Sequence, residues 1–149
     1  MKIGIAGTGY VGLVAGVCFA EFGTDVVCAD IDIRKIQSLN SGIVPFYEPG
    51  VQEWMNRNRE RKRICFTTDM QYMMESAEVI FLAVGTPEGP NWEADLTGVL
   101  DAAGNIGKYM NGYKVIVTKS TVPVGTGARI KSAIQRQLDA RGANLDFDI

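Results

Sequence analysis

Residues 7–12 read GTGYVG, a segment in which glycine occupies the first, third and sixth positions. The apolar stretch before it, residues 2–6, is expected to form a strand. The mostly apolar residues 10–22 after it are expected to form a buried helix. A lone GxGxxG pattern is weak, but a strand–turn–helix context makes it typical of a dinucleotide-binding turn. The helix N-terminus there offers unpaired N–H groups and a positive dipole end to phosphates.

Each glycine of this turn has a steric role in that interpretation. Gly7 permits the tight turn, Gly9 has no Cβ to keep a pyrophosphate from the backbone, and Gly12 lets the helix lie close to the strand. Gly16, one turn further along, extends the same bare helix face. The alternative is a turn that is merely tight and binds nothing.

Asp30 ends the second predicted strand, about twenty positions beyond the turn. A carboxylate at this place can accept hydrogen bonds from both ribose hydroxyls of an adenosine and repels a 2′-phosphate. The sequence therefore predicts NAD rather than NADP as the cofactor. Two cations that follow closely, Arg34 and Lys35, weaken this preference, although they also fit the solvated face of a short helix.

The rest of the chain alternates short apolar runs with helical periodicity, which predicts βαβ units. Strands are expected at residues 2–6, 25–29, 64–66, 78–84 and 114–118, with a further strand just starting at 145–149. Helices are expected at residues 10–22, 32–39, 51–59, 69–75, 95–110 and 127–138, with an Asp cap on the fourth and Gly142 after the last. We predict an α/β fold, a doubly wound parallel sheet of Rossmann type, truncated in or before its last strand.

Two further strand ends place a hydroxyl before a proline. Thr86 precedes Pro87 after the fourth strand, and the segment STVP, residues 120–123, follows the fifth. In open α/β sheets the ligand lies beyond the carboxyl ends of the strands. We therefore expect Thr86 and Thr121 to contact the cofactor or to position a water molecule, although either residue could simply cap a turn.

Composition excludes several other classes of function. The chain has no histidine, so it has no His-based metal site or Ser-His catalysis, and no metal site is expected. The cysteines at 18, 28 and 65 lack metal-ligand spacing and lie in apolar stretches, which predicts small buried hydrophobic residues in a reducing cytosol.

Charge and hydropathy exclude nucleic acid and membrane as partners. The net charge is −2, and the basic run at residues 57–63 fits a solvated helix C-terminus better than a nucleic-acid site. The apolar N-terminus mimics a signal peptide, but its five glycines and its continuation into Glu21 argue against one. No segment has the roughly 20 apolar residues of a membrane span. We expect a cytoplasmic protein.

Several segments together resemble the UDP-glucose/GDP-mannose dehydrogenase family, and they span nearly the whole chain. They are GTGYVGLVAGVCFAEFG (7–23), ADIDIRKI (29–36), PFYEPG (45–50), VGTPEGPNWEADL (84–96) and KSTVPVGT (119–126). GVCFAEFG (16–23) and KSTVPVGT are most similar to the UDP-glucose 6-dehydrogenase branch. Residues 88–93 differ from the usual proline- and glycine-rich version of their loop.

The resemblance implies an enzyme that oxidises the C6 alcohol of a nucleotide sugar to a carboxylate with two NAD+, through a thiohemiacetal and a thioester on a cysteine. It implies cofactor contacts at Val11, Asp30, Lys35, Thr86 and Thr121. It also implies a catalytic role for Thr121, which would position a water near the reacting carbon. We include Tyr10, beside Val11 in the glycine turn, in the expected cofactor site.

The family's nucleophilic cysteine motif, its NPEF segment and its sugar-nucleotide domain are missing from this sequence. We therefore expect residues 1–149 to be an NAD-binding domain that binds NAD without turnover. The nucleotide sugar would bind through absent domains, and the complete protein would be a homodimer or larger homo-oligomer. Two alternatives stay open: the same domain of a GDP-mannose or UDP-N-acetylmannosamine 6-dehydrogenase, and a non-catalytic module that senses NAD.

Overall fold

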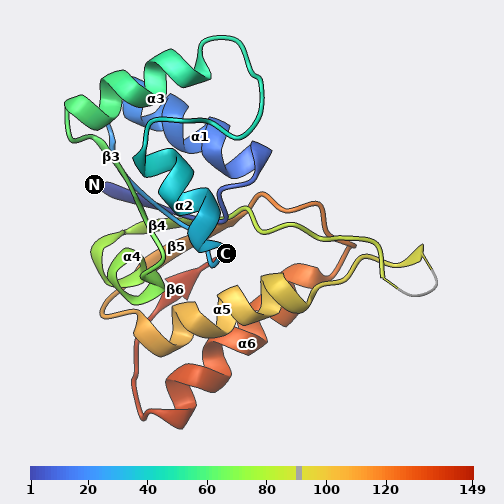
Figure 1. The fold of residues 1–149 in the computed structure, drawn as a ribbon. Helices are drawn as coiled ribbons and strands as arrows, with labels where there is room; N and C mark the ends of the chain where they lie inside the picture. The colour runs from blue at the N-terminus through green and yellow to red at the C-terminus, as the bar shows by residue number, and fades with distance from the viewer. Residues whose placement is uncertain (90–91) are drawn as a thin grey trace.

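A six-stranded, entirely parallel sheet with strand order β3-β2-β1-β4-β5-β6 forms the centre of the fold (Figure 1). The computed structural model describes residues 1–89 and 92–149. The strands are β1 (Lys2–Ala6), β2 (Asp25–Ala29), β3 (Ile64–Thr67), β4 (Val79–Leu82), β5 (Lys114–Thr118) and β6 (Phe147–Asp148). The chain order reverses between β1 and β4, the point at which open α/β sheets bind ligands.

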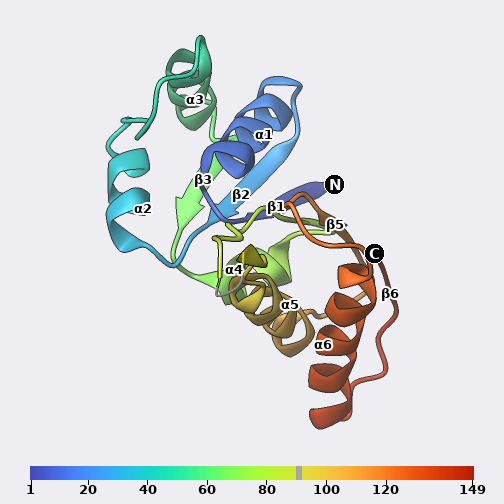
Figure 2. The same cartoon turned by 90° about the vertical axis from the view of Figure 1, so that its right-hand side faces the viewer.

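Three helices cover each face of the sheet, as Figures 1 and 2 show. One layer contains α1 (Tyr10–Glu21), α2 (Ile33–Asn40) and α3 (Val51–Glu60), and the other contains α4 (Met70–Ser76), α5 (Thr97–Tyr109) and α6 (Thr126–Ala140). Two hydrophobic clusters result, one on each face of the sheet. This burial on both faces explains why the strands are continuous apolar runs instead of alternating ones.

The predicted doubly wound Rossmann-type sheet is confirmed, and every predicted helix and strand is present. The fourth strand is shorter than expected, Val79–Leu82 instead of 78–84, because the chain leaves the sheet before Gly85 and Pro87. Asp69 caps α4 by accepting a hydrogen bond from the N–H of Tyr72, as expected. Gly142 follows α6 with φ +64° and ends it.

Two cations bind the carbonyl ends of helices at the amino edge of the sheet. Lys114, only 3% exposed at the start of β5, donates from Nζ to the carbonyl of Ala77 at 2.6 Å, where α4 ends. Arg141 donates to the carbonyls of Gly107 and Met110, at the end of α5. Cations at helix C-termini also interact favourably with the helix dipole. Burial lowers the pKa of Lys114, against the opposing influence of Glu78 and Glu75.

The expectation of three buried cysteines was wrong for Cys65 and only partly right for Cys18. Cys28 is buried, and burial raises the pKa of its thiol. Cys65 is exposed because it alternates with the buried Ile64 and Phe66 on the edge strand β3, and Cys18 is half-buried. Within residues 1–89 and 92–149, no helix is long and apolar enough to cross a membrane.

Candidate functional site at the carboxyl edge of the sheet

The glycine turn between β1 and α1 is packed so closely that two of its glycines cannot be replaced without movement. Gly7 has φ +102°, and a Cβ there would lie 2.5 Å from the carbonyl oxygen of Ala83. A Cβ on Gly12 would lie 2.0 Å from the carbonyl oxygen of Gly7. At Gly16 a Cβ would lie 2.7 Å from Sγ of Cys28, on β2. The predicted roles of Gly7, Gly12 and Gly16 in tight turning and close helix packing are confirmed.

Gly9 differs from its neighbours, because a Cβ there would have no atom of the described residues within 4 Å apart from those of the adjoining residues in the chain. Gly9 is the N-cap of α1, and no side chain caps this helix end. The first N–H groups of α1 have no partner within the helix, as at any helix start. No acidic residue lies in the first turn of α1. The glycine turn therefore presents bare backbone donors, and Val11 is exposed beside them.

Asp30 lies directly after β2 and is only 6% exposed. Its Oδ2 accepts hydrogen bonds from both the backbone N–H and the hydroxyl of Thr8, each at 2.8 Å. Its Oδ1 accepts the N–H of Asp32 at 2.9 Å, and Nζ of Lys35 lies 3.6 Å from Oδ2. Burial alone would raise the pKa of Asp30. The hydrogen bonds from Asp32 and Thr8, with the Lys35 ammonium, outweigh burial and place the pKa below its ordinary value.

This lowered pKa makes Asp30 a contributor to acid sensitivity. A carboxyl group whose pKa is lower in the folded than in the unfolded chain stabilises the fold above the unfolded pKa, about 3.9. That stabilisation is lost as pH falls from about 5 through the folded pKa. We expect the free energy of unfolding of Asp30→Asn to fall less steeply than that of the parent as the pH is lowered from about 5 to about 2. Urea unfolding at a series of pH values measures this difference, with Asp25→Asn on the same strand as the control. Equal slopes for parent and Asp30→Asn would contradict it.

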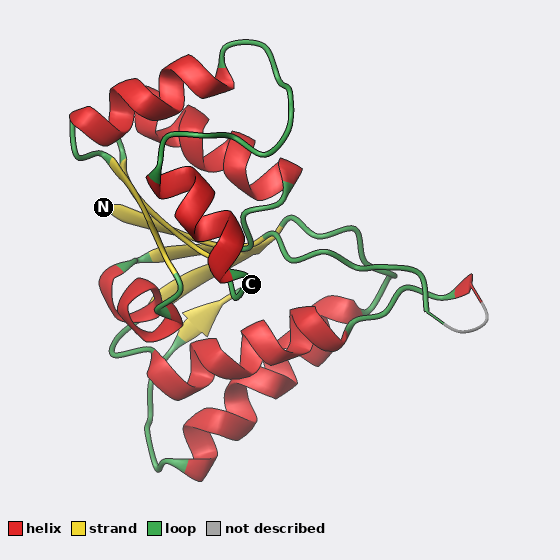
Figure 3. Cartoon of the chain, in the orientation of Figure 1, coloured by secondary structure: helices red, strands yellow, loops and turns green. Residues whose placement is uncertain are grey.

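Side chains at the ends of β4 and β5 bond the two following loops together. The hydroxyl of Thr86 donates to the carbonyl of Thr121 at 2.9 Å, and the hydroxyl of Ser120 donates to the carbonyl of Val84 at 2.6 Å. Figure 3 shows these loops leaving the same edge of the sheet, and Thr121 is exposed there. The structure thus brings Thr86 and Thr121 together, with the Thr86 hydroxyl committed to a backbone carbonyl.

The loop after β4 continues into an arm closed by backbone hydrogen bonds. Glu88 and Ala94 form an antiparallel bridge, and the N–H of Asp95 donates to the carbonyl of Pro87 at 2.8 Å. Of residues 88–93, the loop that the sequence analysis singled out, 90 and 91 lie outside the described residues. Trp92, at φ +64°, is 88% exposed.

Sequence reasoning missed two contacts made by residues it had singled out. The hydroxyl of Tyr10 donates to Glu48, which raises the pKa of Tyr10, and its ring packs on Phe46 with centroids 5.1 Å apart. These contacts join the glycine turn to the loop between α2 and α3. Arg57, assigned to a solvated helix end, instead donates to Glu21 of α1 at 2.6 Å. The available signal for the contact of Tyr10 was the PFYEPG segment (45–50), which contains both of its partners, Phe46 and Glu48.

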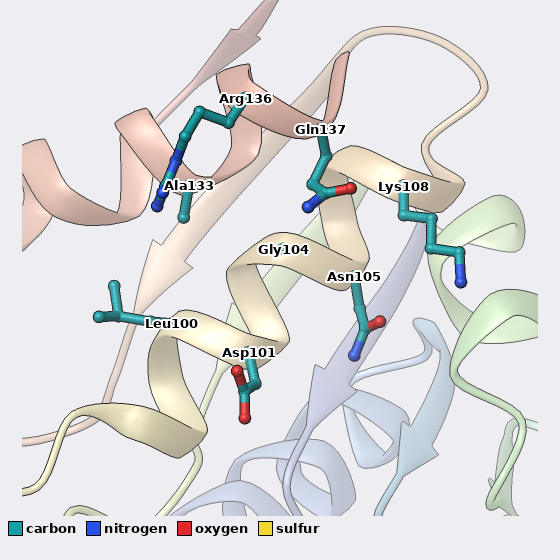
Figure 4. A pocket seen from close by; sticks show the side chains of 8 residues that line it. All are labelled: Leu100, Asp101, Gly104, Asn105, Lys108, Ala133, Arg136 and Gln137. Atoms are coloured by element: carbon teal, nitrogen blue, oxygen red, sulfur yellow. The ribbon is translucent and has the colours of Figure 1, made fainter. Parts of the chain in front are cut away.

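A separate groove of about 690 Å³ lies between α5 and α6, away from the predicted site (Figure 4). Asp101, Asn105 and Lys108 line it from α5, and Arg136 and Gln137 line it from α6. It contains none of the residues predicted from sequence to bind a cofactor. Those residues instead gather at the carboxyl edge, around the point where strand order reverses.

Comparison with known proteins agrees with this geometry. The chain is 51% identical over 148 residues to the UDP-glucose 6-dehydrogenase TuaD of Bacillus subtilis, covering 99% of this chain and 32% of that protein. It is 47% identical over 136 residues to a UDP-glucose 6-dehydrogenase of Rhizobium meliloti, covering 91% of this chain and 31% of the relative. The chain therefore spans about a third of the length of these relatives.

Solved structures give the same result. A UDP-glucose dehydrogenase from Pyrobaculum islandicum superposes with a TM-score of 0.90 at 32% identity, over 98% of this chain and 34% of that one. A GDP-mannose dehydrogenase from Pseudomonas aeruginosa, solved as a ternary complex, gives 0.88 at 32% identity, over 99% of this chain and 34% of that one. The model for the NAD-binding domain of one family matches residues 1–149. With its glycine turn and Rossmann-like sheet, the chain belongs to the UDP-glucose/GDP-mannose dehydrogenase family and is its NAD-binding domain.

Proposed function

We propose that NAD binds across the carboxyl edge of the sheet, with its pyrophosphate at the glycine turn and its adenosine ribose at Asp30. The observation that carries this proposal is the buried Asp30 carboxylate directly after β2, beside an uncapped helix N-terminus. The residues present fit the cofactor. Gly9 leaves open space where a Cβ would stand, and backbone N–H groups of α1 suit an anion. Tyr10 and Val11 lie at this helix start.

The ribose contact differs in detail from the sequence-based hypothesis. A carboxylate has about four acceptor positions, and Thr8 and Asp32 already use three of those on Asp30. One position on Oδ1 is left for a ribose hydroxyl. The Lys35 ammonium, whose side chain is 43% exposed, is beside the carboxylate as a donor to the other hydroxyl. The Asp30 carboxylate would repel a 2′-phosphate at this place, which favours NAD.

Asp30→Ala tests this assignment. Loss of a charged acceptor should weaken NAD binding by about 1–3 kcal/mol, or roughly 5- to 150-fold in Kd. Calorimetric titration of the 149-residue chain measures the change. Asp32→Ala is the matched control, since Asp32 caps α2 and its backbone N–H, which bonds Asp30, is kept. Unchanged affinity in a folded Asp30→Ala protein would disprove the ribose assignment.

We further propose that the complete protein oxidises UDP-glucose to UDP-glucuronate. Identity of 51% to a UDP-glucose 6-dehydrogenase over nearly the whole chain supports this substrate. Because the chain is also similar in structure to a GDP-mannose dehydrogenase, GDP-mannose is the second candidate substrate. NAD supplies a hydride acceptor, and this chain's residues bind and orient it at the sheet edge. Thr121, exposed beside Thr86, is our candidate for positioning a water at the reacting carbon.

The nucleotide sugar can be tested only with the remaining two-thirds present, since we propose that this part holds the cysteine and the sugar site. Purified complete protein should reduce NAD+ with UDP-glucose faster than with GDP-mannose or UDP-N-acetylmannosamine, and in a ratio of two NADH per sugar. Faster turnover of either other sugar would overturn the assignment. We expect this protein to sediment as a homodimer or larger homo-oligomer, and a monomer would contradict that expectation.

A further inference from the structure

We propose that Thr8 is a positioning residue for cofactor recognition, fixing the Asp30 carboxylate so that Oδ1 is the oxygen presented to the ribose. This inference rests on the proposed ribose contact. Thr8 lies in the middle of the glycine turn, between Gly7 and Gly9, and is 1% exposed. It was not among the residues that the sequence pattern singled out, because the second position of GxGxxG accepts many residue types.

The geometry is a two-point attachment from one residue. The Thr8 backbone N–H and hydroxyl both donate to the same oxygen of Asp30, each over 2.8 Å. Two donors on Oδ2 fill its acceptor positions. They also fix the torsion of the carboxylate, and the bond from the Asp32 N–H to Oδ1 fixes it from the other side. The remaining acceptor lone pair on Oδ1 is therefore held in a single direction.

The attachment also connects two parts of the proposed site. Thr8 belongs to the turn proposed to bind the pyrophosphate, and Asp30 belongs to the strand end proposed to bind the ribose. A hydrogen bond to a charged group within a buried site is stronger than a neutral one. Displacement of the turn would therefore move the carboxylate with it, and the spacing between the two subsites is set before the cofactor arrives.

Among the contacts of the described residues, the charged groups around Asp30 all belong to the segment that follows it into α2. Lys35 of α2 lies 3.6 Å from Oδ2, and Arg34 is paired with Asp32 across 3.7 Å. The glycine turn contributes the uncharged Thr8. Removal of the Thr8 hydroxyl thus leaves the surrounding charges unchanged and isolates one hydrogen bond.

Thr8→Val, which keeps the shape and the backbone N–H but loses the hydroxyl, tests the proposal, with Thr8→Ser as the conservative control. Because the hydroxyl favours the ionised carboxylate, the Asp30 titration midpoint should rise in Thr8→Val and return toward the parent in Thr8→Ser. Carbon-13 NMR of the Asp30 carboxyl in the cofactor-free chain measures this midpoint. NAD affinity by calorimetry should fall about 3- to 10-fold in Thr8→Val and stay near the parent in Thr8→Ser.

Both readouts are taken at pH values where circular dichroism shows that each variant is still folded, so a change in stability alone would not produce these results. Should Thr8→Val fail to fold, Thr8→Ala supplies the same two readouts. An unchanged Asp30 midpoint, or equal NAD affinity in Thr8→Val and Thr8→Ser, would overturn the positioning role. Failure of the parent chain to bind NAD would instead disprove the proposed function, and the NMR readout would still decide whether Thr8 fixes Asp30.

Discussion

Gly12→Ala should destabilise the fold by about 3 kcal/mol, because the new Cβ would lie 2.0 Å from the carbonyl oxygen of Gly7. Backbone contacts of this kind cannot be relieved by rotating a side chain. The helix would have to move away from β1, which would loosen its packing against Ile3 and Ile5. Thermal unfolding should show a fall in Tm of about 6–12 °C for that change in a chain of this size.

Gly104→Ala, on α5, provides the comparison. A Cβ there has no atom of the described residues within 4 Å, apart from the local helix backbone, and alanine favours helix. Its Tm should therefore equal or exceed that of the parent. A Gly12→Ala protein as stable as the parent would show that the glycine turn is less tightly packed than the structure indicates.

Gly9→Ala should have the opposite profile, with nearly parental stability and weakened NAD binding. Apart from those of the adjoining residues in the chain, the added methyl group meets no atom of the described residues within 4 Å, and the φ of −69° is open to any residue. It would stand where we propose that the pyrophosphate approaches the backbone. Loss of one or two charge-assisted hydrogen bonds should weaken binding about 10- to 100-fold.

Calorimetric titration with NAD, read beside a thermal unfolding curve for the same sample, separates the two glycines. Gly9→Ala should change the first measurement and Gly12→Ala the second. An unaltered Kd for Gly9→Ala would place the pyrophosphate away from this turn. Gly104→Ala, in which the added methyl group also meets open space but on α5, away from the predicted site, serves as the control for an added methyl group elsewhere.

The fold could be predicted from the sequence because its signals are local. Strands buried on both faces appear as continuous apolar runs, and the glycine turn combines with its flanking elements into one recognisable unit. Cys65 was misjudged because an apolar neighbourhood does not reveal which side of an edge strand faces solvent. In the structure Ile64 and Phe66 point into the core, so Cys65 between them faces solvent.

The contacts within the site could not be predicted, because they join residues far apart in the chain. Thr8 and Asp30 are separated by 22 positions, and Thr86 and Thr121 by 35. The sequence indicated which residue types end each strand. Only the strand order, with β1 beside β2 and β4 beside β5, decides which of these ends become neighbours. The use of the Thr86 hydroxyl on a loop carbonyl follows from that order.

Lys114 and Arg141 close the helix ends of α4 and α5 at the edge of the sheet opposite to Asp30. The groups that secure the helices and the groups proposed to recognise NAD thus occupy separate ends of the same strands. Selection for heat resistance can therefore act on one end while selection for cofactor preference acts on the other. Homologues adapted to different temperatures should vary in their cations at the amino edge and keep a common set of residues at the carboxyl edge.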